Sequence, residues 1–211
     1  MEEKQSGTPW KGLKGRIAGW YFGSPFRHLE EILLWGDVRA SVLEEIARRL
    51  KGDEVVLDIG AGAGYLSLPV ARMLKSGKVI SLDLSDEMLH GLKKNIRRKG
   101  LEDKVQILKS SATSIDLGDE SIDIVVSICA FHEFPNPKGT LLEAIRILRP
   151  NGPVIVADFR DTFPGKLIAN DGSIGHGPWK ADDMKALFVS VGLREVVVKT
   201  VRNEILALGV K

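Results

Sequence analysis

Five short apolar runs alternate with longer stretches of mixed polarity along this 211-residue chain, and the alternation limits the fold more than any other feature. The runs are rich in Val and Ile and mostly lack the period-2 pattern of a half-exposed strand, as is typical of parallel strands buried on both faces. The predicted strands are Glu54–Asp58, Lys78–Asp83, Lys104–Lys109, Ile122–Cys129 and Val154–Phe159. The helices predicted between them are Leu66–Leu74, Asp86–Arg98 and Lys138–Leu148. Such a βαβ succession with right-handed crossovers predicts a doubly wound α/β domain that binds its ligand at the carboxyl ends of the strands.

Both ends of the chain fall outside this alternation. Residues 193–211 contain two apolar strands joined by Arg202-Asn203, a tight connection that favours an antiparallel pair at one edge of the sheet. Six of the 13 aromatic residues lie in the first 37 residues, before a helix predicted over Val38–Leu50 with Asp37 as its N-cap. We therefore predict an aromatic-rich N-terminal segment, 1–37, followed by the main domain, 38–211. The segment either closes over a bound ligand or anchors itself to the core.

The composition excludes several classes of protein. The single cysteine, Cys129, excludes an internal disulfide and a cysteine-based zinc cluster, and we expect no metal site. No run approaches 18 apolar residues and the first residues are polar, so we expect a cytoplasmic protein without a membrane span. The net charge of +2 offers no global field for nucleic acid. We interpret the basic run Lys93–Lys99 as a solvated helix face, because no aromatic residues interleave it.

A glycine-rich loop follows the first predicted strand. The sequence VVLDI runs directly into Gly60-Ala61-Gly62-Ala63-Gly64, shortly before the next predicted helix. Glycines let the chain turn sharply there and let a ligand approach the backbone. The dinucleotide fingerprint GxGxxG has its third glycine one position later, where this chain has Tyr65. The loop is therefore of a nucleotide-binding type but departs from the dinucleotide pattern.

Two acidic residues accompany this loop. Asp58 lies two residues before Gly60, where a negative charge opposes a pyrophosphate but suits a ligand with an ammonium or sulfonium group. Asp83 ends the next predicted strand, from which a carboxylate can accept hydrogen bonds from both hydroxyls of a ribose. Its alternative role is to cap the following helix, but Ser85 is a better N-cap for that helix.

Four sequence blocks occur in a fixed order: VLDIGAGAGYLSLPVA, VISLDLSDEML, SIDIVVSICAFHEF and EAIRILRPNGPVIVADF. Together they resemble the class I S-adenosylmethionine-dependent methyltransferases, over about residues 38–211. Within that class the chain is most similar to the small-molecule enzymes of the ubiquinone and menaquinone biosynthesis type. The resemblance implies a Rossmann-like three-layer sandwich with a seven-stranded, mostly parallel sheet whose last strand is antiparallel. It also implies S-adenosyl-L-methionine as the cofactor.

The resemblance further implies which residues hold this cofactor. They are Asp58 near its ammonium group, Gly60, Gly62 and Gly64 beside its methionyl part, Asp83 at its ribose hydroxyls, Leu84 beside its adenine and Cys129 beneath its methionyl arm. After the third strand, Ser110-Ser111-Ala112 stands where the family often has Gly-Asp-Ala. This departure keeps a backbone contact from Ser111 and Ala112 to the adenine but weakens the side-chain contact.

Candidate catalytic residues follow the fourth and fifth predicted strands. Methyl transfer from a sulfonium is an in-line displacement, so the protein aligns the acceptor, excludes water and sometimes removes a proton. His132 and Glu133 follow the fourth strand, and an imidazole there could act as a base or orient the acceptor. His176 lies between two glycines in a loop after the fifth strand, on the same side of the sheet. Their structural alternatives are a turn cap for His132 and an exposed loop residue for His176. Asp158 could face the substrate or hold a loop.

The sequence therefore predicts a methyltransferase that acts on an unidentified small-molecule acceptor. The alternatives are a protein or RNA methyltransferase and a catalytically inactive cofactor-binding protein of the same fold. The chain lacks an Asn/Asp-Pro-Pro-aromatic motif after the fourth strand, which argues against methylation of exocyclic or amide nitrogens. The single cysteine argues against pyrimidine-C5 chemistry on RNA. A nicotinamide-dependent oxidoreductase is disfavoured by Tyr65 and Asp58.

Overall fold

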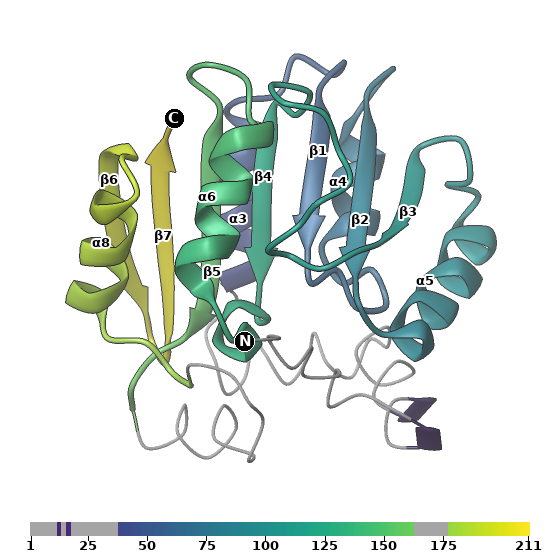
Figure 1. Ribbon diagram of the computed structural model, residues 1–211. Helices are drawn as coiled ribbons and strands as arrows, with labels where there is room; N and C mark the ends of the chain where they lie inside the picture. Colours follow the sequence, from purple (N-terminus) through teal and green to yellow (C-terminus); the bar gives the residue numbers. More distant parts are fainter. Residues whose placement is uncertain (1–11, 14–15, 18–37, 163–176) are drawn as a thin grey trace.

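One mixed β-sheet with helices on both faces makes up the described part of the chain (Figure 1). The computed structural model describes residues 12–13, 16–17, 38–162 and 177–211. The strands are β1 (Val55–Ile59), β2 (Lys78–Asp83), β3 (Val105–Lys109), β4 (Ile124–Ile128), β5 (Pro153–Phe159), β6 (Arg194–Val201) and β7 (Glu204–Val210). They form a seven-stranded sheet in the order β3-β2-β1-β4-β5-β7-β6. The direction of winding reverses between β1 and β4, and ligands bind outside the carboxyl ends of the strands at such a switch point.

The predicted strands are confirmed, with small shifts at their ends. β1 to β5 pair in parallel, and β7 pairs antiparallel with both β5 and β6. β4 is shorter than the predicted run Ile122–Cys129, because Ile122 forms an isolated bridge with Leu148 and Cys129 adopts a left-handed conformation with φ of 51°. The antiparallel pair predicted for the C-terminus is β6 and β7, joined by Arg202 and Asn203.

The helices form the two outer layers of the predicted sandwich. The residues of α3 (Val38–Ala47), α4 (Ser67–Met73) and α5 (Asp86–Lys99) pack with one face of the sheet. α6 (Pro137–Ile147) and α8 (Ala181–Ser190) pack with the other face and lie in front of the sheet in Figure 1. Successive strand residues point to opposite faces, so Val56 joins the first core and Leu57 joins the second. None of the described helices is long and apolar enough to cross a membrane.

Local signals explain the helix ends that position the site. Ser85 caps α5 by accepting a hydrogen bond from the backbone N–H of Met88, as predicted. Gly100 ends α5 in the left-handed conformation that favours glycine. α3 ends at Ala47 rather than at the predicted Leu50. α8 was not predicted from the sequence.

The predicted N-terminal segment, 1–37, lies almost entirely outside the described residues, so its role as a lid or an anchor stays a prediction. Among its described residues, Gly12 donates its backbone N–H to Oε1 of Glu87 at 2.7 Å. This hydrogen bond lowers the pKa of the Glu87 carboxyl. It also places Gly12 beside the first turn of α5.

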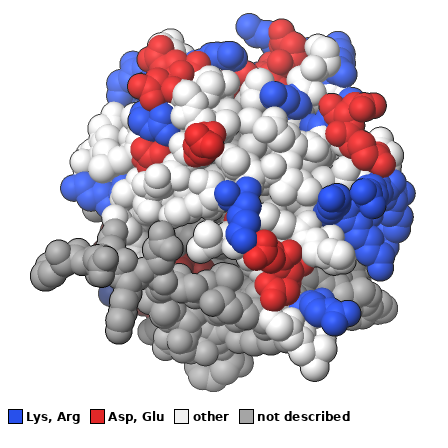
Figure 2. All heavy atoms as spheres, turned by 45° about the vertical axis from the view of Figure 1, so that its right-hand side comes forward, with Lys and Arg blue, Asp and Glu red and all other residues white. Residues whose placement is uncertain are grey.

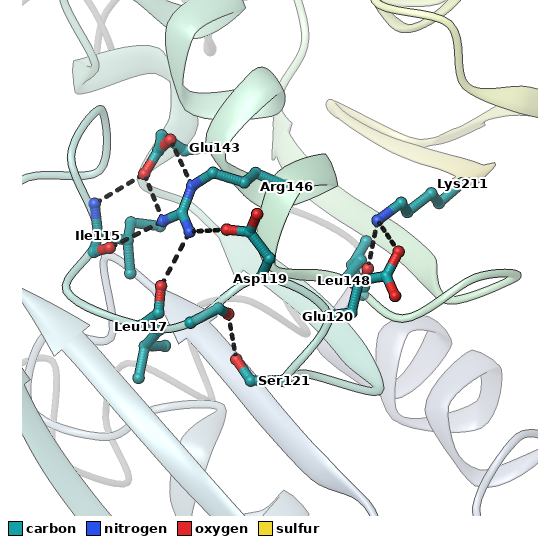
Figure 3. A network of polar contacts seen from close by, with 10 residues as sticks. Ile115, Leu117, Asp119, Glu120, Ser121, Glu143, Arg146, Leu148 and Lys211 are labelled. Atoms are coloured by element: carbon teal, nitrogen blue, oxygen red, sulfur yellow. Dashed lines mark hydrogen bonds and ion pairs between the residues drawn. The ribbon is translucent and has the colours of Figure 1, made fainter.

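Arg146 fixes the segment between β3 and β4 onto α6 (Figure 3). Its guanidinium donates to the carbonyl oxygens of Ile115 and Leu117, each at 2.9 Å, and to Oδ1 of Asp119 at 2.6 Å. Glu143, one turn earlier on α6, accepts from Arg146 and from the backbone N–H of Ile115. The planar fork of arginine suits several fixed acceptors at once. The segment that Arg146 holds also contains Ser111 and Ala112 of the predicted adenine subsite.

We expect Arg146→Ala to lower the free energy of unfolding by about 2 to 3 kcal/mol, because two partly buried carbonyl oxygens lose their donor. Urea unfolding followed by circular dichroism measures this difference. Arg149→Ala is the matched control, since Arg149 makes an exposed ion pair with Asp123 and its loss should cost less than about 1 kcal/mol. Equal effects of the two substitutions would contradict the role given to Arg146.

Candidate active site

The loops that follow β1, β2, β3 and β4 leave the sheet at one edge, the lower edge in Figure 1, because these strands are parallel. The described residues of the predicted site all end these strands or follow them directly. They are Asp58, Gly60, Gly62, Gly64, Asp83, Leu84, Ser111, Ala112, Cys129, His132 and Glu133. His176 lies outside the described residues. The next residue, Gly177, donates its backbone N–H to the carbonyl oxygen of His132 at 3.1 Å.

The glycine loop turns sharply against the ends of β2 and β4. Gly60, Gly62 and Gly64 all have positive φ, at 75°, 53° and 92°. A Cβ atom on Gly60 would lie 2.4 Å from Cβ of Ala130, so glycine is required for this approach. At Gly62 the nearest atom to such a Cβ would be Sδ of Met88 at 4.0 Å, which leaves the backbone open on that side. The loop therefore packs closely at Gly60 and offers an uncovered backbone at Gly62.

Asp83 ties the glycine loop to the start of α5. Its Oδ2 accepts from the backbone N–H of Gly62 and its Oδ1 from that of Ser85, both at 2.8 Å. Ser85 is the N-cap of α5, as predicted, but Asp83 also contacts the start of this helix. Burial raises the pKa of Asp83. Each oxygen can accept a second hydrogen bond, so the group can still receive two ribose hydroxyls.

Leu84 follows Asp83 and presents an apolar surface at the same edge. The residue is 45% exposed. Across the edge, Ser111 is exposed and its hydroxyl pairs with that of Thr113 at 3.0 Å, while Ala112 is half-buried against the core. The adenine subsite at Leu84, Ser111 and Ala112 stays a prediction.

Asp58 is a buried carboxylate with an unsatisfied oxygen. Its Oδ2 accepts from Oγ of Ser67 at 2.5 Å, and Ser67 accepts in turn from Ser81 at 2.7 Å. Its Oδ1 is buried without a hydrogen-bond donor in the described part of the chain. Burial, together with the charge of Asp83, raises the pKa of Asp58 to about 7. A buried acceptor of this kind calls for a donor, and an ammonium group supplies one.

Cys129 turns the chain out of β4. Its backbone N–H donates to the carbonyl oxygen of Ala157, and its thiol lies 3.8 Å from Oε1 of Glu204 at the start of β7. It is half-buried and packs against the first core and against Phe159. The predicted position beneath the methionyl arm stays a prediction.

His132 and Asp158 form a buried pair that the sequence analysis did not connect. His132 lies in the short 3₁₀ turn η2 (Phe131–Glu133), and its Nδ1 is 2.8 Å from Oδ1 of Asp158. The backbone N–H of His132 donates to Oδ2 of the same carboxylate at 2.5 Å. Glu133 is half-buried, with Oε1 3.8 Å from Nε2 of His132. The sequence offered one signal for this pair: His132 follows β4 and Asp158 lies at the end of β5, and these two strands are parallel neighbours.

Arg39 is a further residue that sequence reasoning missed. It lies in the first turn of α3, with its guanidinium 4.4 Å from the centre of the Tyr65 ring and Nη1 3.4 Å from the Tyr65 carbonyl oxygen. It brings a positive charge to the glycine loop, opposite in sign to Asp58. The loop is thus flanked by groups suited to both ends of an amino acid, a carboxylate and an ammonium. These features together fit S-adenosylmethionine, whose amino-acid part carries both groups.

Comparison with known proteins decides the family. A family model described as a methyltransferase domain matches residues 50–190, which is more than half of the chain. This chain belongs to that methyltransferase family. Its cofactor is S-adenosylmethionine, as the four sequence blocks implied.

Curated relatives of this methyltransferase carry different substrates in their names. An arsenite methyltransferase of Halobacterium salinarum is 28% identical over 151 residues, which cover 69% of this chain and 38% of the relative. A demethylmenaquinone methyltransferase of Lactobacillus johnsonii is 32% identical over 107 residues, which cover 50% of this chain and 44% of the relative. The chain thus matches less than half of the length of each of these proteins.

Solved structures support the fold of the methyltransferase. A SAM dependent methyltransferase from Aquifex aeolicus has a TM-score of 0.73 and 24% identity, covering 92% of this chain and 97% of its own. An S-adenosyl-L-methionine-dependent methyltransferase from Methanococcus maripaludis, described as putative, has a TM-score of 0.74 and 18% identity, covering 100% of this chain and 97% of its own. At these identities the likeness shows the fold alone. The predicted Rossmann-like architecture is confirmed.

The basic run of the sequence lies on α5 of the methyltransferase, away from the sheet. The outward residues His90, Lys93, Lys94 and Arg97 line a shallow hollow. Figure 2 shows Lys and Arg side chains gathered on the flank where α5 lies. Positive charge in the last turn of a helix is favoured by the helix dipole. The interpretation as a solvated face stays a prediction.

Proposed function

We propose that this protein transfers a methyl group from S-adenosylmethionine to a small-molecule acceptor. The observation that carries the proposal is the glycine loop, which lies between two aspartates in different environments. Asp83 ties the loop backbone at Gly62, and Asp58 presents a buried oxygen that lacks a donor in the described part of the chain. Asp83 would hold the ribose, Asp58 the ammonium group and Leu84 one side of the adenine.

The cofactor supplies a methyl carbon bonded to a positively charged sulfur. This chain's task is to hold the acceptor in line with that carbon and to exclude water. His132 and Glu133 lie at the edge where the acceptor would bind, and we assign them and His176 to the acceptor side of the site. The single cysteine fits a reducing compartment, so we place the activity in the cytoplasm.

The small-molecule acceptor is supported by the relatives. Two of them are named for arsenite and for demethylmenaquinone. Another relative is named for the guanine N2 position of U6 snRNA, and it is 32% identical over 51% of this chain. RNA would need a surface with stacking side chains beside the basic groups. The hollow on α5 is lined by His90, Lys93, Lys94 and Arg97, none of which is a Phe, Tyr or Trp.

Formation of S-adenosylhomocysteine tests the proposal. The full chain is incubated with S-adenosylmethionine and with separate phenol, quinol, thiol, amine, arsenite and RNA acceptors, and the demethylated product is measured by mass spectrometry. We expect product with at least one small molecule and none with RNA. Turnover of RNA alone would replace the small-molecule proposal, and cofactor binding without any turnover would favour an inactive binding protein.

A further inference from the structure

The pairing of His132 with Asp158 has the geometry of a positioned imidazole. Asp158 is fully buried at the end of β5, and the His132 side chain is 7% exposed. Two contacts hold the pair together: Nδ1 to Oδ1 at 2.8 Å, and the His132 backbone N–H to Oδ2 at 2.5 Å. The second contact fixes the main chain of η2 to the same carboxylate. The ring therefore has little freedom to turn away from Asp158.

The carboxylate also decides which ring nitrogen carries the proton. An ionised aspartate only accepts hydrogen bonds, so Nδ1 of a neutral His132 must donate to it. Nε2 then carries the lone pair and is the basic nitrogen. The Phe159 ring packs against the imidazole in a T-shaped arrangement, with 5.2 Å between ring centres. This apolar wall limits the ways in which the ring can be solvated.

We infer that Asp158 positions His132 as a general base for an acceptor that loses a proton on methylation, a hydroxyl or a thiol. The inference rests on the proposed function. The acceptor's oxygen or sulfur forms the bond to the methyl carbon, the carbon–sulfur bond breaks with its electron pair remaining on sulfur, and the acceptor's proton passes to Nε2. Asp158 stabilises the resulting imidazolium through its contact with Nδ1. It is a positioning residue, since it acts only through His132.

Glu133 has a different relation to the ring. Its Oε1 lies 3.8 Å from Nε2, too far for a hydrogen bond but close enough to favour an imidazolium. Among the described residues, Asp158 on β5 and Glu133 on η2 are the carboxylates that pair with the ring. Asp158 sets the tautomer of His132, and Glu133 places a second carboxylate beside Nε2.

Nitrogen NMR of the full chain tests the tautomer without any acceptor. Long-range ¹H–¹⁵N correlation spectra distinguish protonated from unprotonated ring nitrogens, and His132→Gln assigns the signals of His132. Above the pKa of the ring, we expect a proton on Nδ1 and a lone pair on Nε2. Asp158→Ala removes the acceptor of Nδ1, so the proton should move largely to Nε2, the form that a free imidazole favours. Asp123→Asn, a carboxylate change just before β4, should leave the pattern unchanged.

A proton on Nε2 in the wild type, or an unchanged pattern in Asp158→Ala, would overturn the inference. Calorimetric binding of S-adenosylhomocysteine is measured on the same samples and is expected to stay within threefold in both His132→Gln and Asp158→Ala. A wild type that does not bind S-adenosylhomocysteine would overturn the proposed function instead. The two failures are distinguishable because the NMR signals of the His132 ring do not depend on the cofactor.

Turnover provides the second measurement. With an acceptor of the phenol or thiol class, kcat of the wild type should rise with pH and level off above the pKa of the ring. His132→Gln and Asp158→Ala should lose at least 100-fold in kcat, with a smaller loss for acceptors that are already ionised. Equal losses of kcat for neutral and ionised acceptors would contradict the inference, because they would indicate that His132 and Asp158 act only on the structure. A wild type that methylates only acceptors without a dissociable proton would overturn the assigned acceptor class.

Discussion

Asp83→Ala is expected to weaken the binding of S-adenosylhomocysteine by about 100-fold or more. A charged acceptor contributes about 1.5 to 3 kcal/mol to each hydrogen bond, and two ribose hydroxyls would lose their partner. The substitution also releases the Gly62 backbone, which Asp83 holds at 2.8 Å, so the loop becomes less well organised. Isothermal titration calorimetry with the full chain measures the change.

The neighbouring acid Asp86 gives a matched control for this measurement. It lies three residues further along the chain, and its pairing with Lys109 is exposed on both sides. Asp86→Ala should therefore bind S-adenosylhomocysteine within threefold of the wild type. If Asp83→Ala also kept this affinity, Asp83 would not be the ribose ligand, and the site would have to be placed elsewhere.

Asp58→Asn is expected to stabilise the ligand-free protein at alkaline pH and to weaken cofactor binding. Burial raises the pKa of Asp58 from its ordinary value of 3.8 to about 7. The stability that the raised pKa contributes is fully present below pH 3.8, the ordinary pKa of the group, and it is lost as the pH rises through about 7. The wild type should therefore lose about 1.4 kcal/mol of unfolding free energy between pH 6 and pH 8 from this group alone.

In Asp58→Asn, the unfolding free energy should not show this loss between pH 6 and pH 8. The affinity of this variant for S-adenosylmethionine at pH 7.5 should fall by about 10- to 100-fold, because an amide cannot neutralise the ammonium group. Below pH 7 the affinity of the wild type should decrease up to about tenfold per pH unit, since binding must expel the proton from Asp58. Urea unfolding at several pH values and calorimetry together give both quantities.

Ser67→Ala provides the comparison for Asp58. It removes the hydroxyl that donates to Oδ2 of Asp58 and leaves the carboxyl in place. The pKa of Asp58 should then rise further, moving the pH dependence of cofactor binding to higher pH. An unchanged affinity in Asp58→Asn, or a pH dependence that persists in that variant, would contradict the assignment of Asp58 to the ammonium group.

The sequence predicted those parts of the fold that depend on local chemistry. Ser85 and Gly100 delimit α5 because a hydroxyl N-cap and a left-handed glycine act within one turn of the helix. The strands were found because both of their faces are buried, which leaves continuous runs of Val and Ile. The glycine loop and its two acids were found because their spacing reflects one strand, one turn and one crossover.

The features that were missed depend on contacts between distant residues. Asp158 meets His132 only because β5 lies beside β4, and neither residue carries a pattern that links it to the other. Arg146 holds two backbone carbonyl groups, and carbonyl acceptors leave no trace in side-chain identity. α8 has only two buried residues, Met184 and Phe188, so its amphipathic pattern is weak. The acceptor site shares this difficulty, because its shape depends on loops rather than on spacing.

Titration of the full chain with S-adenosylmethionine in a calorimeter, beside a parallel titration with NADPH, tests the central claim most directly. The structure predicts one site per chain for S-adenosylmethionine, competition by S-adenosylhomocysteine and no heat from NADPH. Binding of NADPH in place of S-adenosylmethionine, or no binding of S-adenosylmethionine by the folded chain, would contradict the account.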